Sequence, residues 1–141
     1  MKTLLLVFAC AFGEDADPTT VRAIEGAKIL HSSMRDPDSF KIGRVWIIQS
    51  AKYGEAAWIC YEYYARNGFG GMNFNRAVYS PHSKKDLAQG KYILDVGDSD
   101  HEPYRLEGCK NQPDGKHTIL RGDVTKEVKQ ALKDEVDNAK P

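Results

Sequence analysis

The segment from Ala57 to Ala65 constrains the fold most, because its residues alternate between two faces that are both largely apolar. Aromatic and β-branched residues favour a strand, in which successive side chains point to opposite sides. One face carries Trp58, Cys60, Glu62 and Tyr64, and the other carries Ile59, Tyr61 and Tyr63. Since neither face is plainly polar, we expect this strand to be central in a sheet and covered, at least in part, on both sides.

The flanking segments predict further strands joined by turns. Residues 50–55 are polar around Gly54 and suit a hairpin connection, and Asn67-Gly68 is a strong turn signal. Pro81 and the polar stretch behind it interrupt the strand pattern. The predicted strands are Lys41 to Gln49, Ala57 to Ala65, Asn73 to Tyr79, Lys91 to Val96 and a short one at Tyr104 to Cys109.

Helical patterns flank these strands. Asp17 is suited to cap a helix that begins at Pro18, and Asp36-Pro37 ends that helix, because a residue before proline is pushed out of the helical region. Asp123 is suited to cap a second helix. The expected apolar stripes are Ala23, Ala27, Leu30 and Met34 in the first helix, and Val124, Val128, Leu132 and Val136 in the second. We therefore expect an α+β fold: an N-terminal helix packed on an antiparallel sheet of four to five strands, plus a C-terminal helix.

The first thirteen residues differ from the rest of the 141-residue chain. An apolar run follows Lys2, and the small residues Ala11 and Gly13 fit a signal-peptidase site. We expect residues 1–13 to be a signal peptide and residues 14–141 to be one domain. A buried N-terminal strand or helix is the alternative. No other segment is apolar over a length that would span a bilayer.

The predicted pairing of the cysteines depends on where the signal peptide is cleaved. Cleavage after residue 13 removes Cys10 and leaves Cys60 and Cys109, which can form a disulfide in an oxidising compartment. Two separate buried thiols are the alternative. The expected location is secreted or periplasmic. Cys10 also fits, more loosely, the lipidated cysteine of a lipoprotein signal, which would anchor the protein instead.

Charge and residue spacing predict no cofactor, no metal and no nucleic-acid partner. Basic and acidic side chains both number 20, so no excess positive charge collects phosphate. His31, His82, His101 and His117 are scattered without metal-ligand spacing. The acidic stretch from Asp95 through Asp98 and Asp100 to Glu102 lacks the glycine of a calcium loop and has Pro103 in its place.

The residue patterns that would indicate a catalytic site are also weak. Cys60 and Glu62 share a strand face, but no imidazole is placed to activate the thiol. We expect Glu62 to pair with Arg76 on the neighbouring strand, because an unpaired carboxylate among aromatic residues would be costly. Trp58, Tyr61, Tyr63 and Tyr64 suit cross-strand packing or, alternatively, a glycan or peptide platform. We interpret the adhesion-like tripeptide Arg121-Gly122-Asp123 as a turn into the last helix.

Three short motifs occur in a recognisable order. They are Asp36-Pro37-Asp38-Ser39-Phe40, then Cys60-Tyr61-Glu62, then Asn67-Gly68-Phe69-Gly70-Gly71. In this the chain resembles a family of small bacterial and phage-associated exported proteins and lipoproteins whose function is not established. The family usually has tyrosine where this chain has Met72.

The glycine-rich motif is the candidate binding site. It does not have the spacing of a dinucleotide-binding loop, but glycines around an aromatic ring allow a partner to approach closely. The candidate residues are Asn67, Phe69, Gly70, Gly71 and Met72. We expect a non-catalytic binding or structural module that contacts an unknown protein or envelope component. The alternatives are an inhibitor of an envelope-acting hydrolase and a small hydrolase that uses Glu62 or an aspartate of 95–100.

Overall fold

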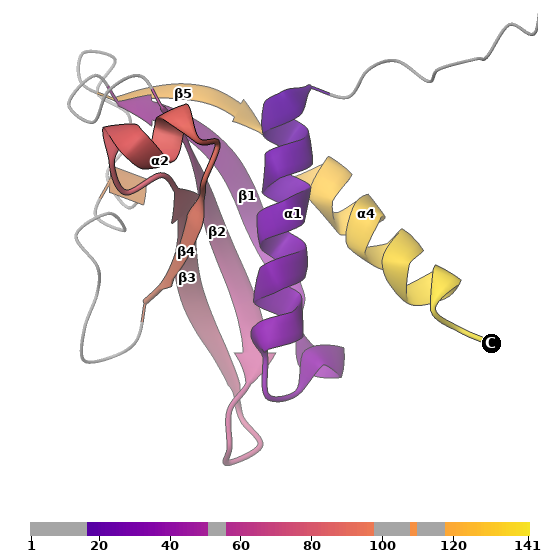
Figure 1. Cartoon of the computed structure of the whole chain (residues 1–141). Coiled ribbons are helices and arrows are strands. Elements are labelled where there is room, and N and C mark those ends of the chain that lie inside the picture. Colours follow the sequence, from indigo (N-terminus) through magenta and orange to yellow (C-terminus); the bar gives the residue numbers. More distant parts are fainter. Residues whose placement is uncertain (1–16, 51–55, 98–107, 110–117) are drawn as a thin grey trace, which may run out of the picture.

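The computed structural model describes residues 17–50, 56–97, 108–109 and 118–141. A five-stranded antiparallel sheet forms its centre, and helices α1 and α4 lie on one side of it (Figure 1). The strand order is β4-β3-β2-β1-β5. The strands are β1 (Lys41–Ser50), β2 (Ala57–Arg66), β3 (Met72–Ser80), β4 (Ile93–Val96) and β5 (Thr118–Asp123). The helices are α1 (Pro18–Ser33), the 3-10 helix η1 (Pro37–Ser39), α2 (Lys84–Ala88) and α4 (Thr125–Asn138). The predicted α+β class is confirmed.

Strand β2 is the middle strand, and its first half is buried on both faces, which fits the partial cover that its sequence predicts. Tyr61 and Tyr63 point into a core between the sheet and the helices. Trp58 and Cys60 point into a second core on the opposite face, which also contains Trp46 and Cys109. Both tyrosines are desolvated, which raises the pKa of Tyr63 to about 12 and raises the pKa of Tyr61 further.

Helix α1 packs closely on the sheet through a glycine. The Asp17 carboxylate caps the helix by accepting a hydrogen bond from the Thr20 amide, and Pro18 is its first residue. A Cβ atom on Gly26 would lie 2.6 Å from Cδ1 of Tyr79, so only glycine fits here. The Tyr61 hydroxyl then reaches the Ala23 carbonyl and donates a 2.7 Å hydrogen bond to it. The predicted stripe is correct, although the helix ends at Ser33, one residue before Met34.

A disulfide between Cys60 and Cys109 closes the core on the face opposite the helices. Its Cα atoms are 5.7 Å apart and its cysteines are separated by 49 positions. Both cysteines are buried, beside Trp58 and Val78. The bond therefore attaches a distant segment of the chain to the middle of β2.

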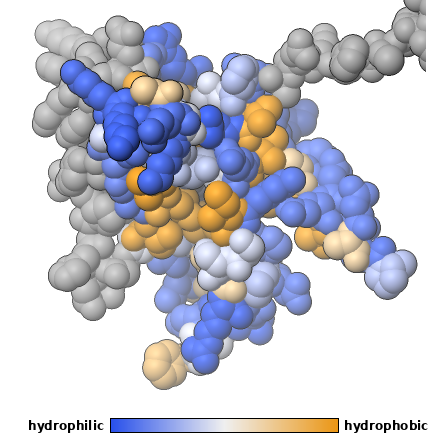
Figure 2. Space-filling view, viewed as in Figure 1, coloured by the Kyte–Doolittle hydropathy of each residue, from blue (hydrophilic) through white to orange (hydrophobic). Residues whose placement is uncertain are grey.

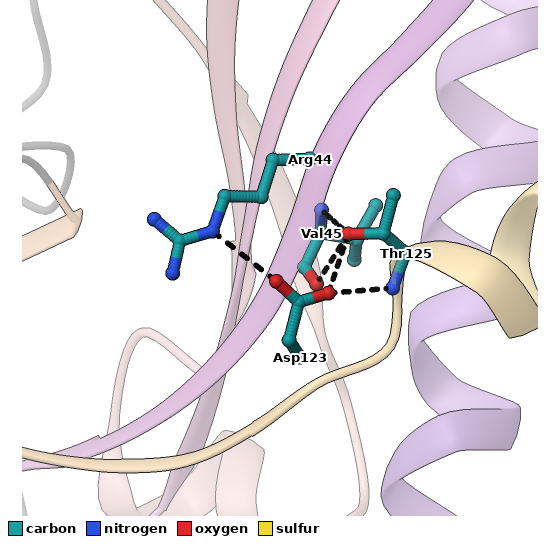
Figure 3. Close-up of polar contacts among 4 residues, drawn as sticks. All are labelled: Arg44, Val45, Asp123 and Thr125. Carbon is teal, nitrogen blue, oxygen red and sulfur yellow. Dashed lines mark hydrogen bonds and ion pairs between the residues drawn. The ribbon is translucent and has the colours of Figure 1, made fainter.

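The junction between β5 and α4 is held by four residues, drawn in Figure 3. The Asp123 carboxylate accepts hydrogen bonds from the amide and the hydroxyl of Thr125, at 3.0 and 2.6 Å. The Thr125 hydroxyl in turn accepts from the Val45 amide at 2.9 Å, and Arg44 pairs with Asp123 at 3.3 Å. These bonds satisfy the first amide of α4 and fix its start against β1. The N-cap residue is Val124 and not the predicted Asp123, so the Asp123 carboxylate acts from one residue before the N-cap.

Some elements differ from the prediction. Helix α2 and strand β5 were not predicted, and β4 is shorter than Lys91 to Val96. The strand predicted at Tyr104 to Cys109 falls mostly outside the described residues, and the part that is described, Gly108 and Cys109, is helical. Other predictions also concern residues outside the described ranges. They are the signal peptide with its Cys10, the 50–55 connection beyond Ser50, His101, His117, and the acidic residues Asp98, Asp100 and Glu102 with Pro103. Among the helices that the structure describes, none is both long and apolar enough to cross a membrane.

Removal of the disulfide should destabilise the fold strongly. For a separation of 49 residues, loop-closure entropy predicts a loss of about 4 kcal/mol in the free energy of unfolding. Urea unfolding of the variant Cys60→Ala/Cys109→Ala measures this loss. Dithiothreitol should destabilise the parent protein and a Cys10→Ala control, and should leave the double variant unchanged. A parent protein that unfolds at the same urea concentration with and without reductant would contradict the prediction.

The hydrogen bonds of Asp123 at the start of α4 should make the free energy of unfolding depend on pH in the acidic range. The hydrogen bonds from Thr125, foremost that of its hydroxyl, hold the pKa of Asp123 below its ordinary value. A carboxyl group whose pKa is lower in the folded state stabilises the fold above its unfolded-state pKa of about 3.9, and loses this contribution as the pH falls further. At neutral pH, Asp123→Ala should therefore cost about 1 kcal/mol, the usual value of a cap.

Two further variants distinguish the effect of the Asp123 hydrogen bonds from the effect of removing a negative charge. Asp123→Asn keeps an acceptor oxygen and should lose less stability than Asp123→Ala. Asp134→Asn changes an exposed carboxylate of α4 that accepts from Gln130, and should have little effect. Unfolding curves at neutral pH and well below the pKa provide the comparison. A deficit of Asp123→Ala that is as large in acid as at neutral pH would show that the charged cap is not responsible.

Candidate functional site

The predicted loop is the turn that joins β2 to β3, and it projects beyond the ends of the helices (Figure 1). Phe69 lies in this turn with its side chain fully exposed, at 101% of the reference area. Figure 2 shows apolar surface at the end of this hairpin, separate from the other apolar surface in that view. Exposure of an apolar ring of this size to water is unfavourable, and a partner that covered the ring would bury most of its surface area.

The turn is built around Asn67. The backbone amide of Asn67 donates to the Gly71 carbonyl at 2.8 Å, which closes the loop. Its side-chain oxygen accepts from the amides of Phe69 and Gly71, at 2.9 and 3.0 Å, and its side-chain nitrogen donates to Asn73 at 3.2 Å. Gly70 has φ of +87°, a conformation that favours glycine. The residue types of the motif are thus explained by the turn, and the turn fixes the backbone that carries Phe69.

A second group of exposed side chains lies on the hairpin strands behind the turn. Tyr64 and Phe74 are a cross-strand pair whose ring centroids are 5.4 Å apart, and both are about two fifths exposed. Met72 opens β3 and is also exposed. These three side chains share the face of the sheet opposite α1. Together with Phe69 they form the surface that we call the hairpin surface: Tyr64, Phe69, Met72 and Phe74.

Arginines surround the hairpin surface. The Arg76 guanidinium lies 4.9 Å from the centroid of the Phe74 ring and 4.0 Å from the Glu62 carboxylate. Glu62 faces Arg76 directly in the strand register, as predicted. At the turn, Arg35 lies beside Gly68, where a Cβ atom would be 2.8 Å from its guanidinium nitrogen. The arginines supply donors at the edge of an apolar surface, a combination that is common in protein interfaces.

The predicted aromatic platform is divided between the core and the surface. Trp58, Tyr61 and Tyr63 are buried, so they are not available to a ligand, and Tyr64 alone of the four is exposed. Phe74 was not among the predicted site residues. Its position follows from the register of the hairpin, because Phe74 lies directly opposite Tyr64. The signal was present in the alternation of Met72, Phe74 and Arg76, which share one face.

The residues with catalytic side chains do not assemble into a reactive centre. Cys60 is in the disulfide and Glu62 is in the ion pair. His82 and Asp95 approach to 2.6 Å. The Ser80 hydroxyl at the end of β3 is buried and has no hydrogen-bond partner among the described residues, so it does not join this pair. In the ranges that the structure describes, no three His, Cys, Asp or Glu side chains are grouped as metal ligands. The tripeptide Arg121-Gly122-Asp123 forms the end of β5 and is not the predicted turn. Arg121 donates to Gln49 and Asp123 accepts from Thr125, so the tripeptide has structural contacts.

Comparison with known proteins gives no match: no protein-family model, curated protein or solved structure is significantly similar to this chain. The family resemblance of the motifs 36–40, 60–62 and 67–71 stays a prediction.

The Glu62–Arg76 pair should contribute modestly to stability. Both side chains are about one third exposed, and such pairs usually contribute less than about 1 kcal/mol. Arg76→Ala also loses the contact with Phe74, so it should lower the free energy of unfolding by about 1 kcal/mol. A double-mutant cycle with Glu62→Gln measures the pair itself. Arg66→Ala, which breaks a more exposed pair with Asp36, is the matched control and should cost less. An unchanged melting temperature for Arg76→Ala would contradict the predicted pair.

Proposed function

We propose that this chain is an exported, non-catalytic binding module that contacts a protein or envelope component through the hairpin surface. The single observation that supports this most is Phe69, a fully exposed ring on a turn whose residue Asn67 takes part in five hydrogen bonds. Tyr64 and Phe74, the exposed aromatic residues beside it, are partly covered by their neighbours. Because the backbone of the turn is already ordered, binding through Phe69 costs little backbone entropy, which favours recognition.

The remaining side chains of the surface extend the contact along one face of the hairpin. Tyr64, Phe74 and Met72 are only partly exposed, and the Arg76 guanidinium packs against the Phe74 ring. Aromatic side chains and arginine are the residues that most often dominate binding energy at interfaces. In this proposal Phe69 enters a pocket of the partner, and the pair Tyr64–Phe74 lies against its rim.

The location is part of the same proposal. The Cys60–Cys109 disulfide favours an oxidising compartment, because such bonds are rare in the reducing cytosol. We therefore infer that the protein is secreted or periplasmic, with residues 1–13 as its signal peptide. Anchoring through a lipid on Cys10 is the alternative form of export.

One feature also supports the narrower function of an inhibitor of an envelope-acting hydrolase. The hairpin is convex and ends in one apolar ring, a shape that is complementary to the concave cleft of an enzyme. Contact with such an enzyme would use the same residues as any other partner. The two functions differ in whether binding lowers the activity of the partner.

Photo-crosslinking tests the surface directly. A photoreactive phenylalanine in place of Phe69 should form a crosslink to a specific partner in envelope extract. The same residue in place of Val21, which is exposed on α1, is the matched control and should not crosslink to that partner. Phe69→Ala should weaken binding to the isolated partner by about tenfold or more, as hot-spot aromatic residues do. Equal recovery of the partner with Phe69→Ala and with the parent protein would refute the proposal.

A further inference from the structure

The apolar stripe of α4 continues beyond the core that it packs on. Val128 is completely buried against the sheet and α1, and Leu132, one turn later, is partly buried. Val136, another turn later, is 46% exposed. Figure 1 shows the reason: α4 diverges from α1 toward its C-terminal end, so the sheet no longer lies beneath its last turns. The sequence thus places apolar residues where the chain itself does not cover them.

A hollow of about 300 Å³ lies under this half of α4. Its other walls come from the C-terminal end of α1, from η1 and from the start of β1. The apolar part of its lining is Phe40, Ile42, Leu132 and Val136. Figure 2 shows apolar surface on this part of α4 between hydrophilic side chains. The volume is at the lower end of the range for small-molecule pockets, about 300–1,000 Å³.

The shape of the hollow is fixed by contacts that do not involve a ligand. His31 forms a 3.1 Å hydrogen bond through Nε2 with the Pro37 carbonyl. The His31 ring also packs against Phe40 at 5.5 Å between centroids, and Phe40 packs against Tyr63 of the core at 5.4 Å. Two walls of the hollow are therefore attached to the buried sheet, and the apolar floor is preformed.

The charges at its edge favour an anion. Lys129 and Lys133 are one helical turn apart on α4, both are exposed, and neither has an ion pair among the residues that the structure describes. The lining contains two carboxylates, and that of Asp137 is paired with Lys140 at 3.2 Å. Two ammonium groups thus stand against the carboxylate of Asp38. An anionic group between the lysines would gain two charge-assisted contacts next to an apolar cavity.

We propose that this hollow binds a small amphiphilic anion, an alkyl monocarboxylate whose chain lies on Phe40, Ile42, Leu132 and Val136 and whose carboxylate binds Lys129 and Lys133. The apolar chain covers the part of the α4 stripe that the core leaves exposed. The carboxylate supplies the counter-charge for the ammonium group that Asp38 leaves unbalanced. This site lies on the helix side of the sheet and is independent of the hairpin surface.

Binding of decanoate to the full chain, measured by isothermal titration calorimetry and by amide chemical shifts, tests the proposal. Decanoate should bind with shifts at Leu132 and Val136, and 1-decanol should bind more weakly. Lys129→Gln/Lys133→Gln should weaken the binding of decanoate by about tenfold, because two partly solvated ion pairs are lost. The same variant should leave the affinity for 1-decanol unchanged.

A second variant tests the cavity itself. Val136→Asp places a carboxylate at the half-exposed wall and should weaken decanoate by about tenfold or more, through repulsion and loss of apolar contact. Val21→Asp, on a similarly exposed valine of α1, is the matched control and should bind decanoate as the parent does. Unaltered melting temperatures establish that both variants are folded.

Three results would overturn the proposal. The first is the absence of decanoate binding to the parent protein. The second is binding that is equal for decanoate and 1-decanol or unchanged in Val136→Asp. The third is a parent dimer in light scattering that Val136→Asp converts to a monomer, which would identify a second copy of the chain as the occupant.

Discussion

The packing of α1 on β2 positions most of the other elements. Gly26 allows the helix backbone to approach the sheet until the Tyr61 hydroxyl reaches the Ala23 carbonyl, and a methyl group at Gly26 would prevent this approach. With that contact in place, β2 is buried on the helix side along its length. The opposite side of β2 is buried by Trp46, Trp58 and the disulfide. A strand covered in this way must be paired on both edges, and β1 and β3 provide the pairing.

The same packing also determines where the molecule is exposed. On the face opposite the helices, the core around the disulfide ends near Cys60, and Glu62 and Tyr64 lie farther along the same strand. Beyond Cys60 that face becomes progressively more exposed, which leaves Tyr64 and Phe74 in contact with solvent. The hairpin surface is thus the continuation of a rigid, buried strand pair. Backbone hydrogen bonds of Asn67 with Gly70 and Gly71 close the turn between β2 and β3, and the Phe69 amide donates to the Asn67 side chain. The turn is therefore held by the strand pair although none of its own side chains is buried.

Local patterns in the sequence predict much of this fold. The alternation in β2 and the stripe of α1 have the periods of a strand and a helix, and the structure has both. Helix α2 was missed although Ser83, which caps it by accepting from Asp86, was a readable signal. Strand β5 was missed for another reason: it is a short edge strand that contains Gly122 and pairs with β1, which is distant in sequence. The exposure of Tyr64 could not be predicted, because Trp58 and Tyr64 lie on one face and only the tertiary contact with Cys109 distinguishes them.

Both candidate sites arise where a regular element is longer than the core that supports it. The β2–β3 hairpin extends past α1, and α4 extends past the sheet. Apolar residues at such ends cost stability through exposure and aggregation without adding to the core, whereas polar residues would keep the same secondary structure. Phe69 stands out because its side chain is fully exposed, and Val136 stands out because it lines the hollow under α4. A partner for the first and a small anion for the second give each side chain the burial that its own chain does not provide.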